Sequence, residues 1–124
     1  MANVLIVEDS DSVAALEIAL TALPGVRTLL APNGREAIAM LDSNAIDLAA
    51  VITDLHLPYV DGYELVAAIR NHNRYSRLPV IVVSGDNHPE SCRRVRTLGA
   101  DAFFAKPYSP AEIRQTLEEL LHAP

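Results

Sequence analysis

The stretch Ala49-Ala50-Val51-Ile52-Thr53-Asp54-Leu55-His56-Leu57-Pro58 decides the fold of this chain. Its apolar and β-branched run, which begins at Leu48, predicts a buried strand that ends on Thr53. Asp54 follows at once, and Pro58 prevents a simple continuation of the strand. Open α/β sheets bind their ligands at the carboxyl ends of strands. We therefore expect Asp54 to be the reacting group, with helper residues supplied by other strands.

Four more short apolar runs predict strands, and a helical pattern follows each of the five. Parallel strands need such crossovers, and the most apolar strands must be covered on both faces. The sequence thus predicts one doubly wound α/β domain over residues 1–124, with a five-stranded parallel sheet. The predicted strands are Val4–Val7, Val26–Leu30 at an edge, Leu48–Thr53, Val80–Val83 and Ala102–Ala105. The predicted helices are Ser12–Leu23, those begun by the caps Asn33, Asp61 and Ser109, and one with Pro89 in its first turn and Gly99 as its C′ residue.

Composition narrows the class of protein. The 124 residues suit a single domain, and half of them are hydrophobic, which is enough for one core. A formal net charge of −6 argues against nucleic acid and favours proteins or cations as partners. Cys92 is the single cysteine, so an internal disulfide is impossible, as suits a reducing compartment. With no apolar run near the ~20 residues that span a bilayer and no basic leader at Met1, we expect a cytoplasmic protein without a membrane partner.

Polar side chains follow four of the five predicted strands. The first strand is followed by Glu8 and Asp9, the third by Asp54, the fourth by Ser84 and the fifth by Lys106. Because the carboxyl ends of parallel strands meet at one edge of the sheet, these residues should converge. Three carboxylates in one cleft repel, and a divalent cation relieves the repulsion. A few oxygen ligands suit Mg²⁺, which keeps several waters and leaves room for a phosphate oxygen.

The same cluster suits phosphoryl transfer. An aspartate can act as nucleophile toward phosphorus and form an aspartyl-phosphate, and Asp54 is central in the predicted pocket. Lys106 supplies a point charge for phosphate, and the Ser84 hydroxyl can donate to a phosphoryl oxygen. Positioning and charge neutralisation would then do most of the catalysis.

These residues lie in segments that resemble the receiver domain of two-component response regulators over essentially the whole chain. Each segment is a weak signal alone, but all of them in this order at strand ends are specific. The matching segments are Val4-Leu5-Ile6-Val7-Glu8-Asp9, Thr53-Asp54-Leu55-His56-Leu57-Pro58 with Asp61-Gly62, Val82-Val83-Ser84-Gly85, and Gly99-Ala100-Asp101-Ala102-Phe103-Phe104-Ala105-Lys106-Pro107.

The resemblance implies a flavodoxin-like (βα)5 fold with strand order 2-1-3-4-5. It implies that Asp54 is the phosphoacceptor and that Lys106 is the phosphate partner, presented by a cis Lys106–Pro107 bond. The implied metal is Mg²⁺. Its implied ligands are Asp9 directly, Glu8 largely through metal-bound water, Asp54, and the backbone carbonyl of His56.

The resemblance also implies a switch and its partners. Ser84 matches the switch hydroxyl and Phe103 the switch aromatic, although Phe103 is as simply explained as a core residue. A histidine kinase or phosphotransfer protein would supply the phosphoryl group, and an output protein or domain would contact the face formed by the fourth helix and fifth strand. His56 and Asp86 border the path of attacking water. We expect a monomer or weak homodimer that is not an enzyme beyond its own phosphorylation and autodephosphorylation.

Three other functions fit these residues less well. An aspartate-nucleophile phosphohydrolase usually needs a second acid two residues after the nucleophile, where this chain has His56. A flavin-binding module needs a hydroxyl-rich phosphate loop where Glu8 and Asp9 would repel phosphate. A receiver-like adaptor without phosphate would not need an intact acceptor and lysine.

The four histidines lack metal-ligand spacing and are expected on the solvated surface. The start of the chain suggests an N-terminal receiver, either stand-alone or part of a longer regulator or hybrid kinase.

Overall fold

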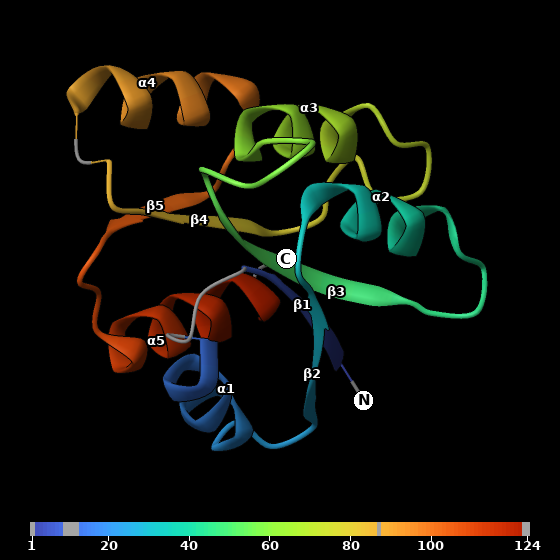
Figure 1. Ribbon diagram of the computed structural model, residues 1–124. Helices are drawn as coiled ribbons and strands as arrows, with labels where there is room; N and C mark the ends of the chain where they lie inside the picture. Colours follow the sequence, from blue (N-terminus) through green and yellow to red (C-terminus); the bar gives the residue numbers. More distant parts are fainter. Residues whose placement is uncertain (1, 9–12, 87, 123–124) are drawn as a thin grey trace.

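The computed structural model describes residues 2–8, 13–86 and 88–122, and these form a single parallel sheet flanked by helices (Figure 1). Strands and helices alternate along the chain, as predicted. The strands are β1 (Ala2–Val7), β2 (Val26–Ala31), β3 (Leu48–Asp54), β4 (Val80–Ser84) and β5 (Ala102–Ala105). The helices are α1 (Val13–Thr21), α2 (Gly34–Asp42), α3 (Gly62–Arg70), α4 (Pro89–Leu98) and α5 (Pro110–Leu121).

The strand order is β2-β1-β3-β4-β5 with parallel pairing throughout, which confirms the predicted topology. The strand β2 lies at an edge, also as predicted, and all of its residues except Ala31 are partly or fully exposed. In contrast, all five residues of β4 are buried. The strand β3 extends one residue further than predicted, so that Asp54 is its last residue rather than the first residue of the loop.

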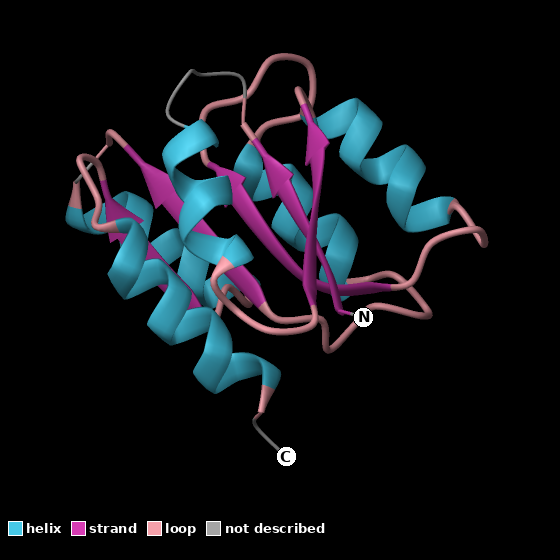
Figure 2. Ribbon diagram, turned by 90° about the horizontal axis from the view of Figure 1, so that it is seen from below, coloured by secondary structure: helices cyan, strands magenta, loops and turns pink. Residues whose placement is uncertain are grey.

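Two hydrophobic cores lie on opposite faces of the sheet because successive strand residues point to opposite sides. On one face α2, α3 and α4 cover the sheet, and on the other α1 and α5 do so (Figures 1 and 2). Strand β1 shows the alternation, since Leu5 and Val7 belong to the first core while Val4 and Ile6 belong to the second. This two-sided burial accounts for the continuous apolar runs in the sequence.

Helix ends follow the predicted capping residues. The side chains of Asn33, Asp61 and Ser109 each accept a hydrogen bond from the backbone N–H three residues later, at 2.9, 2.9 and 3.3 Å. Gly99 ends α4 with φ of 114°, a left-handed conformation that glycine adopts without a Cβ penalty. The predicted helix over Ser12–Leu23 is shorter in the structure, and its first predicted residue lies outside the described part of the chain.

Candidate functional site

The register of the sheet brings distant strand ends to one edge. Glu8 directly follows β1, Asp54 and Ser84 end β3 and β4, and Lys106 directly follows β5. The backbone N–H of Lys106 donates to the Ser84 carbonyl at 2.7 Å, which extends the pairing of β4 and β5 into the site. The aligned pairs next to the site are Val7 with Thr53, Asp54 with Val83, and Ser84 with Ala105.

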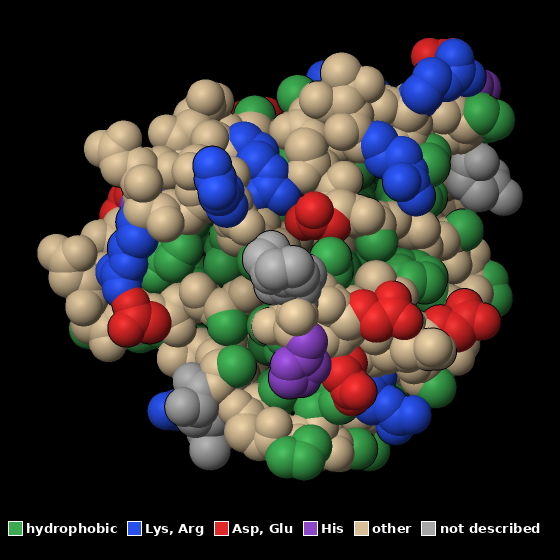
Figure 3. All heavy atoms as spheres, turned by 180° about the vertical axis from the view of Figure 1, so that it is seen from behind, with side chains coloured by type: hydrophobic (Ala, Val, Ile, Leu, Met, Phe, Trp, Pro, Cys, Tyr) green, Lys and Arg blue, Asp and Glu red, His purple; other side chains and the backbone are tan. Residues whose placement is uncertain are grey.

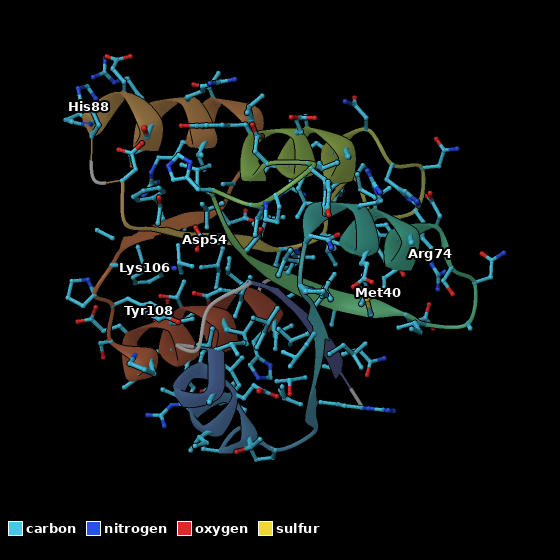
Figure 4. All side chains as sticks on the ribbon, viewed as in Figure 1. Met40, Asp54, Arg74, His88, Lys106 and Tyr108 are labelled. Carbon is cyan, nitrogen blue, oxygen red and sulfur yellow. The ribbon has the colours of Figure 1, made fainter. Side chains whose placement is uncertain are left out.

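The Asp54 carboxylate is held at both oxygens. Its Oδ2 accepts a hydrogen bond from Lys106 Nζ at 2.5 Å, and its Oδ1 accepts one from the backbone N–H of His56 at 3.2 Å. Asp54 is only 7% exposed, so the group sits at the floor of the site rather than on the open surface. Figure 4 shows Asp54 and Lys106 close together at the carboxyl ends of the strands. The carboxylate is therefore oriented before any ligand arrives.

Lys106 joins the two described acids of the site. Its Nζ donates to Glu8 Oε1 at 2.8 Å as well as to Asp54 Oδ2. Partial burial of the ammonium lowers the pKa of Lys106, but the hydrogen bonds and charges of Asp54 and Glu8 outweigh burial and raise that pKa above its usual value of 10.5. Lys106 is the single lysine of the sequence, and its peptide bond to Pro107 is cis. The lysine thus stays charged and neutralises two carboxylates.

Gly62 lets the first turn of α3 pack directly on the backbone of the Asp54 loop. Its N–H donates to the Leu55 carbonyl at 2.8 Å. A Cβ at position 62 would lie 2.6 Å from the Leu55 Cα and 2.7 Å from the Asp54 carbonyl oxygen. Only a glycine allows that approach, and the sequence motif Asp61-Gly62 gave no reason for the glycine beyond resemblance.

The predicted magnesium ligands are partly described. Glu8 and Asp54 lie side by side because both contact one ammonium nitrogen, and the His56 backbone borders Asp54. Asp9, the predicted direct ligand, lies outside the described residues. Within the described residues, no three His, Cys, Asp or Glu side chains gather into a possible metal site. Two buried carboxylates that converge on one positive charge nevertheless fit the oxygen donors that Mg²⁺ prefers.

Ser84 and Phe103, the two predicted switch residues, are placed differently. Ser84 is completely buried, and its Oγ accepts a hydrogen bond from the backbone N–H of Asp86 at 3.0 Å. Phe103 is partly buried and packs against the core under α2, α3 and α4. The role of either residue in a switch stays a prediction.

Sequence reasoning missed the contacts that Asp86 makes. Its Oδ2 accepts a hydrogen bond from Ser91 Oγ at 2.7 Å and lies 3.5 Å from His56 Nε2. Its Oδ1 accepts one from the His88 N–H at 3.0 Å. The backbone bond from His88 and the Ser91 hydroxyl lower the pKa of Asp86, with a smaller contribution from His56. An acid shortly before the helix-starting Pro89 was the available sequence signal for these contacts.

Comparisons with known proteins agree on one family. The family model of the response regulator receiver domain matches residues 4–118. The CAI-1 autoinducer sensor kinase/phosphatase CqsS of Vibrio cholerae is 33% identical over 106 residues, which are 85% of this chain and 15% of that protein. The chemotaxis protein CheY1 of Helicobacter pylori is 29% identical and is covered to 96%, as is this chain.

A solved receiver domain has the same fold and contains a metal ion. The receiver domain of the sensor histidine kinase PA1611 from Pseudomonas aeruginosa superposes with a TM-score of 0.86 at 25% identity, covering 98% of each chain. That crystal structure has a magnesium ion coordinated in its active site cleft.

Proposed function

This chain belongs to the response regulator receiver domain family, and on that premise we propose that Asp54 accepts the phosphoryl group. The donor is a phosphohistidine on a histidine kinase or phosphotransfer protein. Receiver domains are regulators rather than general enzymes, so the reaction modifies the protein itself. The single observation that carries the assignment is the contact of Lys106 with both Asp54 and Glu8.

The transfer step is a displacement at phosphorus. A carboxylate oxygen of Asp54 attacks the phosphorus and forms a new O–P bond. The bond between phosphorus and the donor atom breaks, and that atom leaves with the bonding electron pair. The donor atom is the imidazole nitrogen of a phosphohistidine, or the acetate oxygen when acetyl phosphate is the donor. Because both oxygens of Asp54 are held before the donor arrives, little reorientation of the nucleophile is needed.

The residues of this chain would stabilise the charge that develops. Lys106 keeps its positive charge. Its Nζ, which donates to the Asp54 carboxylate, can donate instead to a phosphoryl oxygen. Ser84 is the last residue of the neighbouring strand β4, and its hydroxyl can donate to a second phosphoryl oxygen. Glu8, Asp9, Asp54 and the His56 carbonyl would hold Mg²⁺. When bound, that ion supplies positive charge against the transferring oxygens and orients them.

The output follows from the added charge. Phosphorylation replaces the single negative charge of the Asp54 carboxylate with a phosphoryl group that carries roughly −1.5 to −2 charges. Drawing Ser84 toward that charge would vacate space next to Phe103 and change the face formed by α4 and β5, which an output protein or domain would contact. On the side of the molecule that faces away from the viewer in Figure 1, acidic and basic side chains are interspersed rather than gathered into a basic patch (Figure 3). In the described part of the chain, no helix is long and apolar enough to cross a membrane.

The assignment is tested with acetyl phosphate and Mg²⁺, followed by intact-mass measurement. We expect the wild-type chain to gain the mass of one phosphoryl group, and the gain to disappear without Mg²⁺. The Asp54→Asn variant keeps the shape of the side chain and should gain nothing. Equal gain on both proteins, or none on the wild type, would refute the role of Asp54.

A further inference from the structure

We propose that Asp86 and Ser91 form a latch that holds the switch hydroxyl of Ser84 in its resting position and connects it to the first turn of α4. The latch consists of Ser84, Asp86, His88 and Ser91. It rests on the proposed function, because it acts on the response to phosphorylation, and it adds Asp86 and Ser91 as positioning residues.

The contacts form a continuous relay. The Asp86 N–H donates to Ser84 Oγ at 3.0 Å, so residue 86 fixes the hydroxyl from the outside of the site. The Asp86 carboxylate is in turn fixed at both oxygens, by the His88 N–H at 3.0 Å and by Ser91 Oγ at 2.7 Å. Ser91 is buried within α4. A movement of the Ser84 hydroxyl must therefore either break the Asp86 contact or carry the first turn of α4 with it.

The latch competes with the phosphorylated state for the same hydroxyl. Among the described residues, the hydrogen bond found at Ser84 Oγ comes from Asp86, and no hydrogen bond to Asp54 is formed. When Ser84 turns toward a phosphoryl group, the Asp86 N–H loses its acceptor. A polar group left without a partner in a partly buried position is costly, so the latch opposes the switch. Freeing Asp86 from Ser91 would let residue 86 move to another acceptor and reduce that cost.

The far end of α4 is held independently, which directs any motion to its first turn. The guanidinium of Arg70 donates to the Gly99 carbonyl from Nε at 3.0 Å and from a terminal nitrogen at 2.7 Å. It also pairs with Asp101 at 3.1 Å. The carboxyl end of α4 is thereby anchored to α3 and to the start of β5. The helix can pivot at Gly99 while the Asp86 end moves.

The test uses Cys92, which lies next to Ser91 on α4 and is the single cysteine of the chain. A trifluoromethyl tag on its thiol reports the environment of α4 by ¹⁹F NMR. Beryllium fluoride with Mg²⁺, a mimic of the phosphoryl group, is titrated into the wild type and into Ser91→Ala. We expect the half-saturating concentration to fall about fivefold in Ser91→Ala, the shift that loss of one hydrogen bond of typical strength produces. We also expect a smaller ligand-induced change of the ¹⁹F signal.

Thr97→Ala is the matched control, because it removes a hydroxyl from the exposed far end of the same helix. It should leave both quantities as in the wild type. A half-saturating concentration or a ¹⁹F change in Ser91→Ala equal to that of Thr97→Ala would overturn the latch. A wild type without any response to beryllium fluoride would instead overturn the proposed function, and the latch with it. Thermal unfolding of each variant separates these outcomes from a simple loss of stability.

Discussion

Replacing Gly62 by alanine should destabilise the protein, although helix propensity alone predicts the opposite. Gly62 is the first residue of α3, and an alanine in a helix is favoured over glycine by up to about 1 kcal/mol. The structure reverses the sign. The new Cβ would lie 2.6 Å from the Leu55 Cα and 2.7 Å from the Asp54 carbonyl oxygen, and neither backbone atom can rotate away.

The expected magnitude follows from the kind of contact. Forcing an extra carbon into a packed region costs about 1–3 kcal/mol, and backbone neighbours place this case in the upper part of that range. Subtracting the gain in helix propensity leaves a net loss of about 1–2 kcal/mol. The displaced backbone is that of Asp54, so the phosphorylation rate should fall together with stability.

Gly85→Ala is the matched control, since a Cβ at Gly85 meets nothing within 4 Å. That substitution should be neutral or stabilise by about 0.4–1 kcal/mol, because it restricts the unfolded chain. Urea unfolding followed by circular dichroism at the helix band measures both variants, since the chain has no tryptophan. With a slope of about 2 kcal/mol/M, the Gly62→Ala midpoint should fall by about 0.5–1 M. A Gly62→Ala protein as stable as Gly85→Ala would refute the reasoning.

Two further predictions concern charge and a buried hydroxyl. With isotopically labelled lysine, NMR should show one lysine, Lys106, titrating above 10.5, and Asp54→Asn should lower its pKa. Because the folded-state pKa of Lys106 is raised, its stabilisation is fully present below the unfolded value near 10.5 and is lost as pH rises through the folded pKa. The free energy of unfolding of Lys106→Met should therefore fall less with rising pH in the alkaline range than that of the wild type. Equal pKa values in wild type and Asp54→Asn would contradict the geometry. Tyr75→Phe should cost about 1–3 kcal/mol in urea unfolding, because the Tyr75 hydroxyl accepts from the buried Leu48 N–H at 3.1 Å and donates to the Ile46 carbonyl at 3.2 Å. A loss below about 0.5 kcal/mol would show that water replaces the hydroxyl.

The sequence was informative wherever local chemistry decides the structure. Caps such as Asn33 and Asp61 act through hydrogen bonds three residues away, so their motifs predicted the starts of α2 and α3 correctly. Continuous apolar runs such as Val80–Val83 predicted strands buried on both faces. Predicted ends were less accurate, as at β3, where the strand continues through Asp54.

Interactions between distant residues escaped local reasoning. The histidines were expected on the solvated surface, which is correct for His56, whose side chain is 63% exposed. His72 is partly exposed, at 22% of its side chain, and it makes a contact that the sequence did not indicate, 3.2 Å from Asp42 across the α2 and α3 ends. Asp9 lies outside the described residues, so its metal role stays a prediction.

By itself, the sequence determined which strand ends carry an acid, a hydroxyl or a lysine, because hydrophobic periodicity and turn residues place each strand without knowledge of its neighbours. The tertiary structure alone decided that Lys106 reaches Glu8 and Asp54 together. The physical reason is that such contacts depend on sheet register and on rotamers across 52 or 98 residues of chain. No local pattern encodes those quantities.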